Sequence, residues 1–238
     1  MNLNWEFMIS DIPTVLSGLW VTLGLTAVSY LGAILIGILF GLILLKKVPV
    51  FYQIVLVVNT VLKGLPLILQ LLFCYYAIPQ ICKTLAATFA FEYDPRNQNY
   101  FLFAAIALSA NFGAYMTDLV VSSYKAIDKG QTEAALAAGM SKLQGILYVV
   151  GPQALVIALP GLSNYFMWLL KATCLASVVN VFEMTSIARA STAVNYAILE
   201  GYLVAAGVYW IVCVVVERLL IGTNELIQNR TGKEKSYA

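Results

Sequence analysis

Long apolar stretches, each bounded by polar or charged residues, divide the chain into five predicted membrane spans. A helix needs about 20 apolar residues to cross a hydrocarbon core about 30 Å thick. Five stretches are long enough: residues 14–45, 51–81, 100–124, 143–170 and 201–217. This pattern predicts an all-α membrane protein, a single transmembrane domain over residues 1–238.

The segments between these spans differ from one another in character. Residues 125–142 are polar and rich in alanine, and they form a predicted cytoplasmic loop, whereas residues 218–238 form a predicted cytoplasmic tail. Residues 172–199 are moderately apolar but carry Glu183 and Arg189, which makes them a poor lipid-facing helix. We expect a re-entrant or surface segment packed against protein, because irregular backbone at membrane depth needs protein or water around it.

Lysine and arginine are distributed unevenly between the two sides that five spans create. Cytoplasmic loops of membrane proteins carry an excess of these residues. The predicted inner side holds Lys46, Lys47, Lys125, Lys129, Lys142, Arg218, Arg230, Lys233 and Lys235, and the outer side holds Lys83, Arg96 and Arg189. The count predicts an outer N-terminus and an inner C-terminus. No basic residue precedes the first apolar run, so we expect no cleaved signal peptide.

Composition narrows the classes of function. The chain of 238 residues is 61% hydrophobic and 11% charged, about half the charged fraction of a soluble domain. A net charge of +2 with scattered basic residues does not indicate a nucleic-acid-binding surface. Histidine is absent and the four cysteines are dispersed, so we expect neither a metal site nor a disulfide framework.

Small residues recur every four positions in the first predicted span, at Ala33, Gly37 and Gly41. Such a stripe lets another helix approach closely. Two readings are open: packing against a helix of the same chain, and a seam between two copies.

The loop 125–142 contains signals for two consecutive helices. Thr132 is placed to cap a helix, and Glu133 suits the positive end of the helix dipole. The alanine-rich run that follows has high helix propensity, and Gly139 fits the left-handed position after a helix. Ser141 and Gln144 then match a capping box, so a second helix is predicted to start there.

This loop resembles the EAA loop of the membrane subunits of ATP-binding-cassette (ABC) importers. The resemblance lies in Glu-Ala-Ala from Glu133, in Gly139, and in Pro152 further on. Four more blocks, in the same order, are similar to the polar-amino-acid permease branch: KGLPLILQ at 63–70, ALSANFGAY at 107–115, LPGLSN at 159–164 and LKATCL at 170–175. The chain departs from the family pattern at Lys63, Leu65, Asp118 and Ala172, where the family has Arg, Thr, Glu and Asp.

The resemblance implies a subunit that moves substrate but does not hydrolyse ATP. No P-loop sequence occurs in the chain, so ATP and Mg²⁺ are expected on a partner ATPase. The implied partners are that ATPase, a second permease subunit (identical or a paralogue), an extracytoplasmic binding protein and a polar amino acid. The implied coupling residues are Gln131, Glu133, Ala134, Ala135 and Gly139. The plainer alternative is that this helix only caps the bundle.

Polar residues inside the apolar spans are candidates for the substrate pathway. They are Lys63, Gly64, Pro66, Gln70, Asn111, Tyr115, Lys171, Thr173 and Glu183. A charge at membrane depth needs water, a counter-ion or a cavity. The competing interpretation for Lys63 and Lys171 is snorkelling or pairing with Asp118 or Glu183. The neutral residues would serve equally in interhelical hydrogen bonds, and Glu183 in a structural pair.

Two further functions remain open at this point. One is a proton- or sodium-coupled secondary transporter that uses Asp118 or Glu183 as a relay, and the other is a membrane scaffold whose loop recruits a soluble partner. The resemblance favours the ABC permease, a multi-pass protein of the bacterial cytoplasmic membrane. The sequence leaves the transported amino acid unidentified.

Overall fold

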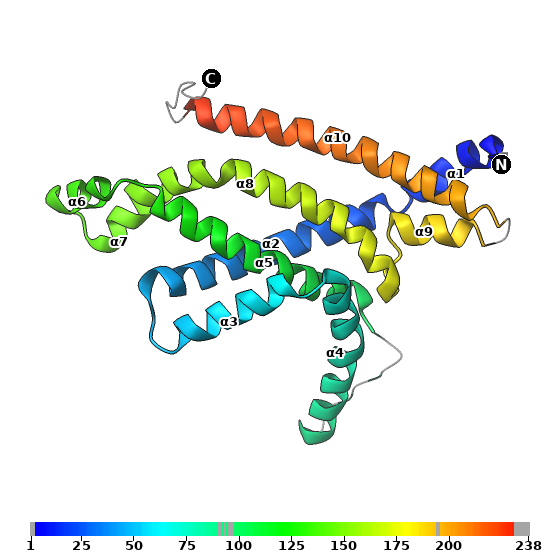
Figure 1. Cartoon of the computed structure of the whole chain (residues 1–238), viewed down its shortest axis with the longest axis horizontal. Helices are drawn as coiled ribbons and strands as arrows, with labels where there is room; N and C mark the ends of the chain where they lie inside the picture. Colours follow the sequence, from blue (N-terminus) through cyan, green and yellow to red (C-terminus); the bar gives the residue numbers. More distant parts are fainter. Residues whose placement is uncertain (1–2, 90–91, 93, 95–97, 194–195, 231–238) are drawn as a thin grey trace.

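The fold of this chain is a bundle of helices (Figure 1). The computed structural model describes residues 3–89, 92, 94, 98–193 and 196–230, with side chains described as far as residue 227. The helices are α1 (Trp5–Leu16), α2 (Leu19–Lys46), α3 (Phe51–Gly64), α4 (Leu67–Phe89), α5 (Tyr100–Lys125), α6 (Lys129–Ala137), α7 (Lys142–Gln144), α8 (Gly151–Ala172), α9 (Met184–Ser191) and α10 (Ile198–Arg230), with a π-helix η1 (Gly145–Val150) and a 3₁₀-helix η2 (Thr173–Val179). Arg96 and residues 231–238 lie outside the described part, so the predictions that rest on them are not compared.

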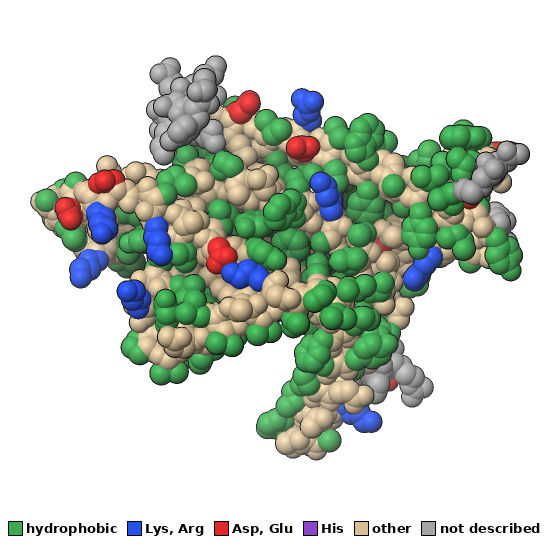
Figure 2. Space-filling view, in the orientation of Figure 1, with side chains coloured by type: hydrophobic (Ala, Val, Ile, Leu, Met, Phe, Trp, Pro, Cys, Tyr) green, Lys and Arg blue, Asp and Glu red, His purple; other side chains and the backbone are tan. Residues whose placement is uncertain are grey.

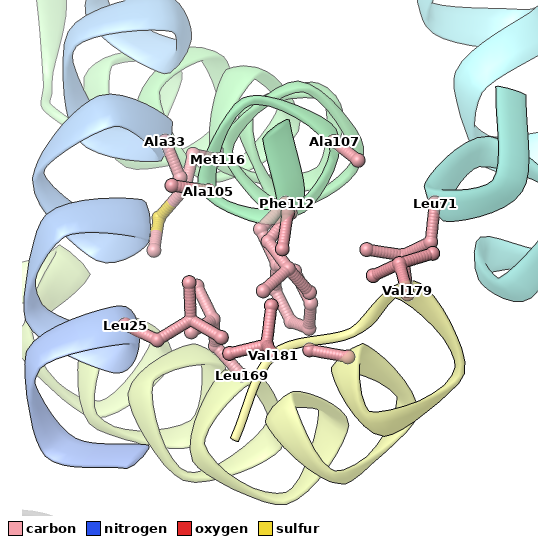
Figure 3. Packing of buried hydrophobic residues seen from close by; sticks show 13 residues of the cluster. Leu25, Ala33, Leu71, Ala105, Ala107, Phe112, Met116, Leu169, Val179 and Val181 are labelled. Carbon is pink, nitrogen blue, oxygen red and sulfur yellow. The ribbon is translucent and has the colours of Figure 1, made fainter. Parts of the chain in front are cut away.

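Helices α2, α5 and α8 form the centre of the bundle, and α10 runs along its side (Figure 1). The largest buried cluster joins α2, α4, α5, α8 and η2, with Leu25, Leu108, Phe112 and Leu169 among its members (Figure 3). A second cluster ties α1, α9 and α10 together around Met184. Helices α6 and α7 lie at one end of the bundle and α1 and α9 at the other (Figure 1).

Five helices in the described part of the chain are long and apolar enough to cross a membrane. They are Leu19–Lys46, Leu67–Phe89, Tyr100–Lys125, Lys142–Val179 and Ile198–Ile227. The number matches the prediction, while most boundaries moved. A separate helix, α1, precedes the first span, and α10 continues past residue 217, where the span 201–217 was predicted to end. Glu217 ended the predicted fifth span but does not end α10, because a charged residue is tolerated within a helix.

The predicted span 51–81 is wrong as a single helix. Pro66 disfavours helical backbone at the residue before it, and Leu65 is accordingly extended, with φ −91° and ψ 137°. Helix α3 therefore ends at Gly64, and α4 leaves at a steep angle to it (Figure 1). With 14 residues, α3 is shorter than a span of about 20, so α4 is the membrane-crossing candidate.

The small-residue stripe of α2 packs against α5 of the same chain. A Cβ atom added to Gly37 would lie 2.5 Å from the Cβ of Met116, and one added to Gly41 would lie 2.7 Å from Val120 Cγ1. From the other side, a Cβ added to Gly113 would meet Ile36 at 2.7 Å. The two backbones are this close because glycine has no side chain. This geometry favours the first of the two readings of the stripe, packing within one chain.

Replacing Gly37 by valine is expected to destabilise the protein by about 1–3 kcal/mol, because three carbon atoms must fit where the backbones touch. The measurement is thermal unfolding of the purified protein in detergent. Gly207→Val is the matched control, since Gly207 lies in α10 with open space around its Cα. Equal losses of stability in the two variants would contradict close packing as the cause.

Candidate functional site

Helix α6 begins at Lys129, three residues before Thr132, so the predicted cap at Thr132 is wrong. The N-cap is Asp128, which has an extended backbone and whose carboxylate accepts a hydrogen bond from the Gly130 amide at 2.7 Å. An aspartate satisfies the free amides of a first turn as well as threonine does. Glu133 consequently lies in the second turn, where the helix dipole contributes little to it.

The end of α6 and the start of the next helix follow the sequence signals. Gly139 has φ +84°, the left-handed conformation that only glycine adopts without strain. Its amide donates to the Leu136 carbonyl at 3.0 Å, and the helix stops there. Ser141 and Gln144 form the reciprocal capping box, with the Ser141 amide donating to Gln144 Oε1 at 2.8 Å. The predicted helix end and capping box are confirmed.

One face of α6 is fixed to the bundle. Gln131 Oε1 accepts a hydrogen bond from Gln153 Nε2 of α8 at 3.2 Å. Ala135 is buried, and its Cβ would touch a Cβ added to Gly145 of η1 at 3.4 Å. A short helix needs such tertiary contacts, because it is marginal alone in water. Of the five predicted coupling residues, Gln131 and Ala135 therefore face the permease itself.

The opposite face of α6 is unoccupied. Glu133 and Ala134 are exposed, and Glu133 makes no hydrogen bond or ion pair with any residue that the structure describes. Apolar side chains of α7 and η1 are exposed as well, with Leu143, Leu147 and Tyr148 each more than half exposed. We call this surface, from Glu133 to Tyr148, the end face. Its π-helix is of a kind often found at functional sites.

Among the predicted pathway residues, Lys63 is paired. Its Nζ lies 2.7 Å from Asp118 Oδ2, which joins α3 to α5. The sequence left this pairing open as the alternative to a substrate contact. The side chains are 28% and 59% exposed, so the pair sits on the surface of the single subunit rather than in its core.

Removing one partner of this pair is expected to cost roughly 0.2–1 kcal/mol, the range of exposed ion pairs, because the remaining charge loses its counter-ion. Thermal unfolding of Lys63→Met, Asp118→Asn and the double variant in detergent measures the coupling. The double variant should lose less than the sum of the single variants. Lys46→Met, at an exposed lysine of α2, is the control and should unfold like the parent. Strict additivity would contradict the interaction.

Gln70 and Asn111 stabilise the break between α3 and α4. Both side-chain amides donate to the Leu62 carbonyl, at 2.7 and 3.0 Å, and Gln70 also donates to the Leu65 carbonyl at 3.0 Å. These carbonyls lose their helical partners where Pro66 interrupts the chain. Gly64 and Pro66 themselves are exposed. The structure thus gives Gln70 and Asn111 the interhelical role that the sequence left open beside substrate contact.

Tyr115 of α5 belongs to a chain of aromatic rings. Its ring centroid lies 6.1 Å from that of Tyr165 on α8, which in turn lies 5.5 Å from Trp168. Tyr115 is half-buried, and Trp168 is exposed. Aromatic packing thus brings the predicted residue of α5 alongside α8.

Glu183 is completely buried, and both oxygens of its carboxylate accept hydrogen bonds. It is the N-cap of α9, where its carboxylate accepts from the Thr185 and Ser186 amides at 2.9 and 2.8 Å. The Tyr209 hydroxyl of α10 donates to the same carboxylate at 2.6 Å. Burial raises the pKa of this carboxyl, and these hydrogen bonds oppose the rise. Glu183 lies outside the five candidate spans, and its contacts are those of a structural cap.

Lys171 and Thr173 are two residues apart in the chain but have different surroundings. Thr173 is buried, donates to the Leu170 carbonyl at 2.6 Å, and lies 3.3 Å from the Tyr209 hydroxyl. Lys171 is exposed beside a cavity between α8 and α10. Sequence reasoning missed Tyr209 and Glu217, which border the same region. The sequence did contain a signal for them: Tyr209 and Glu217 are eight residues apart, a spacing that puts two side chains on the same side of a helix.

Comparison with known proteins identifies the family. Residues 33–221 match the family described as the inner-membrane component of binding-protein-dependent transport systems. The chain belongs to this family. Its members are transport subunits rather than enzymes, and the ATPase is a separate subunit. Membership decides against an ion-coupled carrier and against a scaffold, and it places the chain in the inner membrane as a multi-pass protein.

Individual relatives match over nearly their whole length. A probable amino-acid permease protein, YxeN, of Bacillus subtilis is 32% identical, with 90% of this chain and 91% of the relative covered. The glutamine transport system permease protein GlnP of Escherichia coli is 30% identical over 92% and 95%. A crystal structure described as an amino acid ABC transporter with histidines superposes with a TM-score of 0.79 at 28% identity, covering 94% of this chain and 99% of that one.

Proposed function

We propose that this permease subunit carries a polar amino acid across the bacterial cytoplasmic membrane in an importer driven by a separate ATPase. Three observations support the amino-acid cargo: the permease YxeN is a probable amino-acid permease, GlnP transports glutamine, and the similar solved structure is an amino acid ABC transporter. The main support for the ATP-driven mechanism is the exposed face of α6 at the end of the bundle.

The end face is the proposed docking surface for the ATPase. Glu133 and Ala134 point away from the bundle, whereas Gln131 and Ala135 transmit displacement of α6 to α8 and η1 through their contacts. Gly139 lets the chain turn sharply enough to connect α6 with α7. Movement of the ATPase would in this way reach the membrane helices through a rigid short helix. ATP and Mg²⁺ would bind to the partner.

The proposed orientation places α6 in the cytoplasm, with the N-terminus outside and the C-terminus inside. Basic side chains gather at the end of the molecule that α6, α7 and the α2–α3 connection form (Figure 2). Lys46, Lys47, Lys125, Lys129 and Lys142 belong to this end, in agreement with the excess of positive charge in cytoplasmic loops.

The other proposed partners are a second permease subunit and an extracytoplasmic binding protein. The pair Lys63 and Asp118 supports a second subunit, since charges on the surface of apolar helices usually face protein or water rather than lipid. Tyr115 of α5 and Lys171 of α8 remain proposed pathway residues, because the first side chain is partly exposed and the second is exposed. Gln70, Asn111, Thr173 and Glu183 would act on the pathway only by holding its helices.

Affinity purification from the native host in mild detergent tests the function. We expect a stoichiometric ATPase to co-purify, and its turnover in lipid to rise when the binding protein and one amino acid are added. The amino acid that stimulates turnover identifies the cargo. Recovery of the chain without an ATPase after crosslinking would contradict the proposal.

A further inference from the structure

Three lysines lie where α2 and α5 end, at the end of the bundle that also carries α6 and α7 (Figure 1). The close contacts between α2 and α5 advance along both helices together, and the last of them brings Gly41 against Val120. Five residues further on, Lys46 of α2 and Lys125 of α5 therefore stand at one level, and Lys47 follows directly. All three lysines are exposed.

These lysines have no counter-ion among the residues that the structure describes. None of them forms an ion pair there, and residues 12–91 contain no aspartate or glutamate at all. The two acidic residues nearest to Lys125 in the chain are already engaged, Asp118 in the ion pair with α3 and Asp128 as the N-cap of α6. A group of positive charges without internal compensation attracts an anion from outside the chain.

The connection from α2 to α3 places apolar side chains directly beside this charge. Residues 48–51 are Val-Pro-Val-Phe, and Val50 and Phe51 are 72% and 58% exposed. The connection directly follows the candidate span Leu19–Lys46, so it lies at a membrane boundary. Exposed apolar residues next to lysines are typical of a segment that lies between the hydrocarbon and the headgroups of a lipid leaflet.

The backbone of the connection is strained at Val50. Its φ is 64° and its ψ −56°, and the Phe51 amide donates to the Pro49 carbonyl at 2.7 Å. This is a γ-turn of the rare, strained form, and a β-branched residue is an outlier at positive φ. Such strain persists where the surroundings compensate for it. The described chain leaves Val50 mostly uncovered, so we expect part of the compensation to come from a partner that covers it.

We propose that the α2–α3 connection, together with Lys125, binds an anionic phospholipid. Lys46, Lys47 and Lys125 bind the phosphate of the headgroup, and Val50 and Phe51 lie against the upper part of the acyl chains. In the orientation proposed above, this lipid belongs to the cytoplasmic leaflet, whose negative surface attracts basic segments next to a span. A lipid fits this surface better than a soluble acidic partner does, because charge and exposed apolar side chains adjoin at the end of a span.

Photo-crosslinking locates the lipid. The complete transporter is reconstituted in nanodiscs of phosphatidylcholine that contain a small fraction of a photoreactive lipid, either phosphatidylglycerol or phosphatidylcholine, with a diazirine in the acyl chain close to the glycerol. Mass spectrometry of peptides maps the crosslinks along the chain. Thermal unfolding in detergent without added lipid is measured in parallel. Neither measurement requires transport, so the result does not depend on the cargo.

We expect phosphatidylglycerol to crosslink to residues 46–52 several-fold more than phosphatidylcholine does. The double variant Lys46→Gln, Lys47→Gln should reduce this crosslinking roughly tenfold, because two attractive charges are lost. The double variant Lys46→Arg, Lys47→Arg keeps the charge and should keep the crosslinking. Lys83→Gln, at an exposed lysine of α4 that is predicted on the other side of the membrane, is the control and should behave like the parent.

The variant Val50→Gly separates lipid contact from folding. Glycine adopts positive φ without strain, so this variant should unfold in detergent at the parental temperature or above. Its crosslinking to phosphatidylglycerol should nevertheless fall several-fold, because the apolar contact with the acyl chains is gone.

Equal crosslinking of the two lipids at the connection, or undiminished crosslinking in the glutamine variant, would overturn the proposal. Loss of the ATPase from the glutamine variant, with its lipid crosslinking unchanged, would assign this surface to a protein partner instead. Absence of ATP-driven uptake by the parent complex would contradict the proposed function and would not alter the crosslinking result.

Discussion

Exchanging Glu133 for arginine is expected to reduce ATP-driven uptake by roughly tenfold or more, while the amount of permease in the membrane stays unchanged. Glu133 is exposed on the free face of α6 and has no partner among the described residues, so the permease does not need it to fold. Reversing its charge at the proposed ATPase interface would replace an attraction by a repulsion. Whole-cell uptake and the amount of co-purified ATPase measure the effect.

Glu225→Arg is the matched charge reversal for this experiment. Glu225 is also exposed, but it lies on α10 rather than on the end face. The control should transport at the parental rate. Normal uptake by the Glu133 variant, or an equal loss in both, would contradict docking of the ATPase on α6.

Glu183→Ala is expected to destabilise the protein by about 3 kcal/mol or more, the largest stability effect of any single change considered. The Thr185 and Ser186 amides and the Tyr209 hydroxyl all lose their acceptor in a fully buried site. Unsatisfied buried donors cost about 1–3 kcal/mol each, and loss of an N-cap about 1 kcal/mol. Thermal unfolding in detergent and the yield of folded protein report the loss.

Glu183→Gln is the informative comparison, because it keeps the size of the side chain and one oxygen acceptor. We expect it to lose clearly less stability than the alanine variant. Tyr209→Phe removes only one donor to the carboxylate, so it should destabilise the protein less than either Glu183 variant. Parental stability of Glu183→Ala, combined with altered selectivity for cationic amino acids, would show that this carboxylate contacts substrate instead.

The parts of the site that depend on local signals were predictable. The left-handed glycine at Gly139 and the capping box of Ser141 and Gln144 involve residues within a few positions of each other, so local chemistry decides them. The start of α6 was missed because Asp128 and Thr132 are both good caps, and the helix takes the earlier one. Competing local signals of similar strength leave a boundary undetermined.

What the sequence determined by itself is the membrane class, the number of spans and the end of the loop helix with the capping box that follows it, since burial in lipid demands long apolar helices and helix ends need specific residues. Only the tertiary structure decided which polar groups meet. The partners Lys63 and Asp118 are 55 residues apart, and Asn111 reaches the Leu62 carbonyl across 49. Such contacts depend on how the helices pack against one another, and packing involves the side chains of the whole bundle at once.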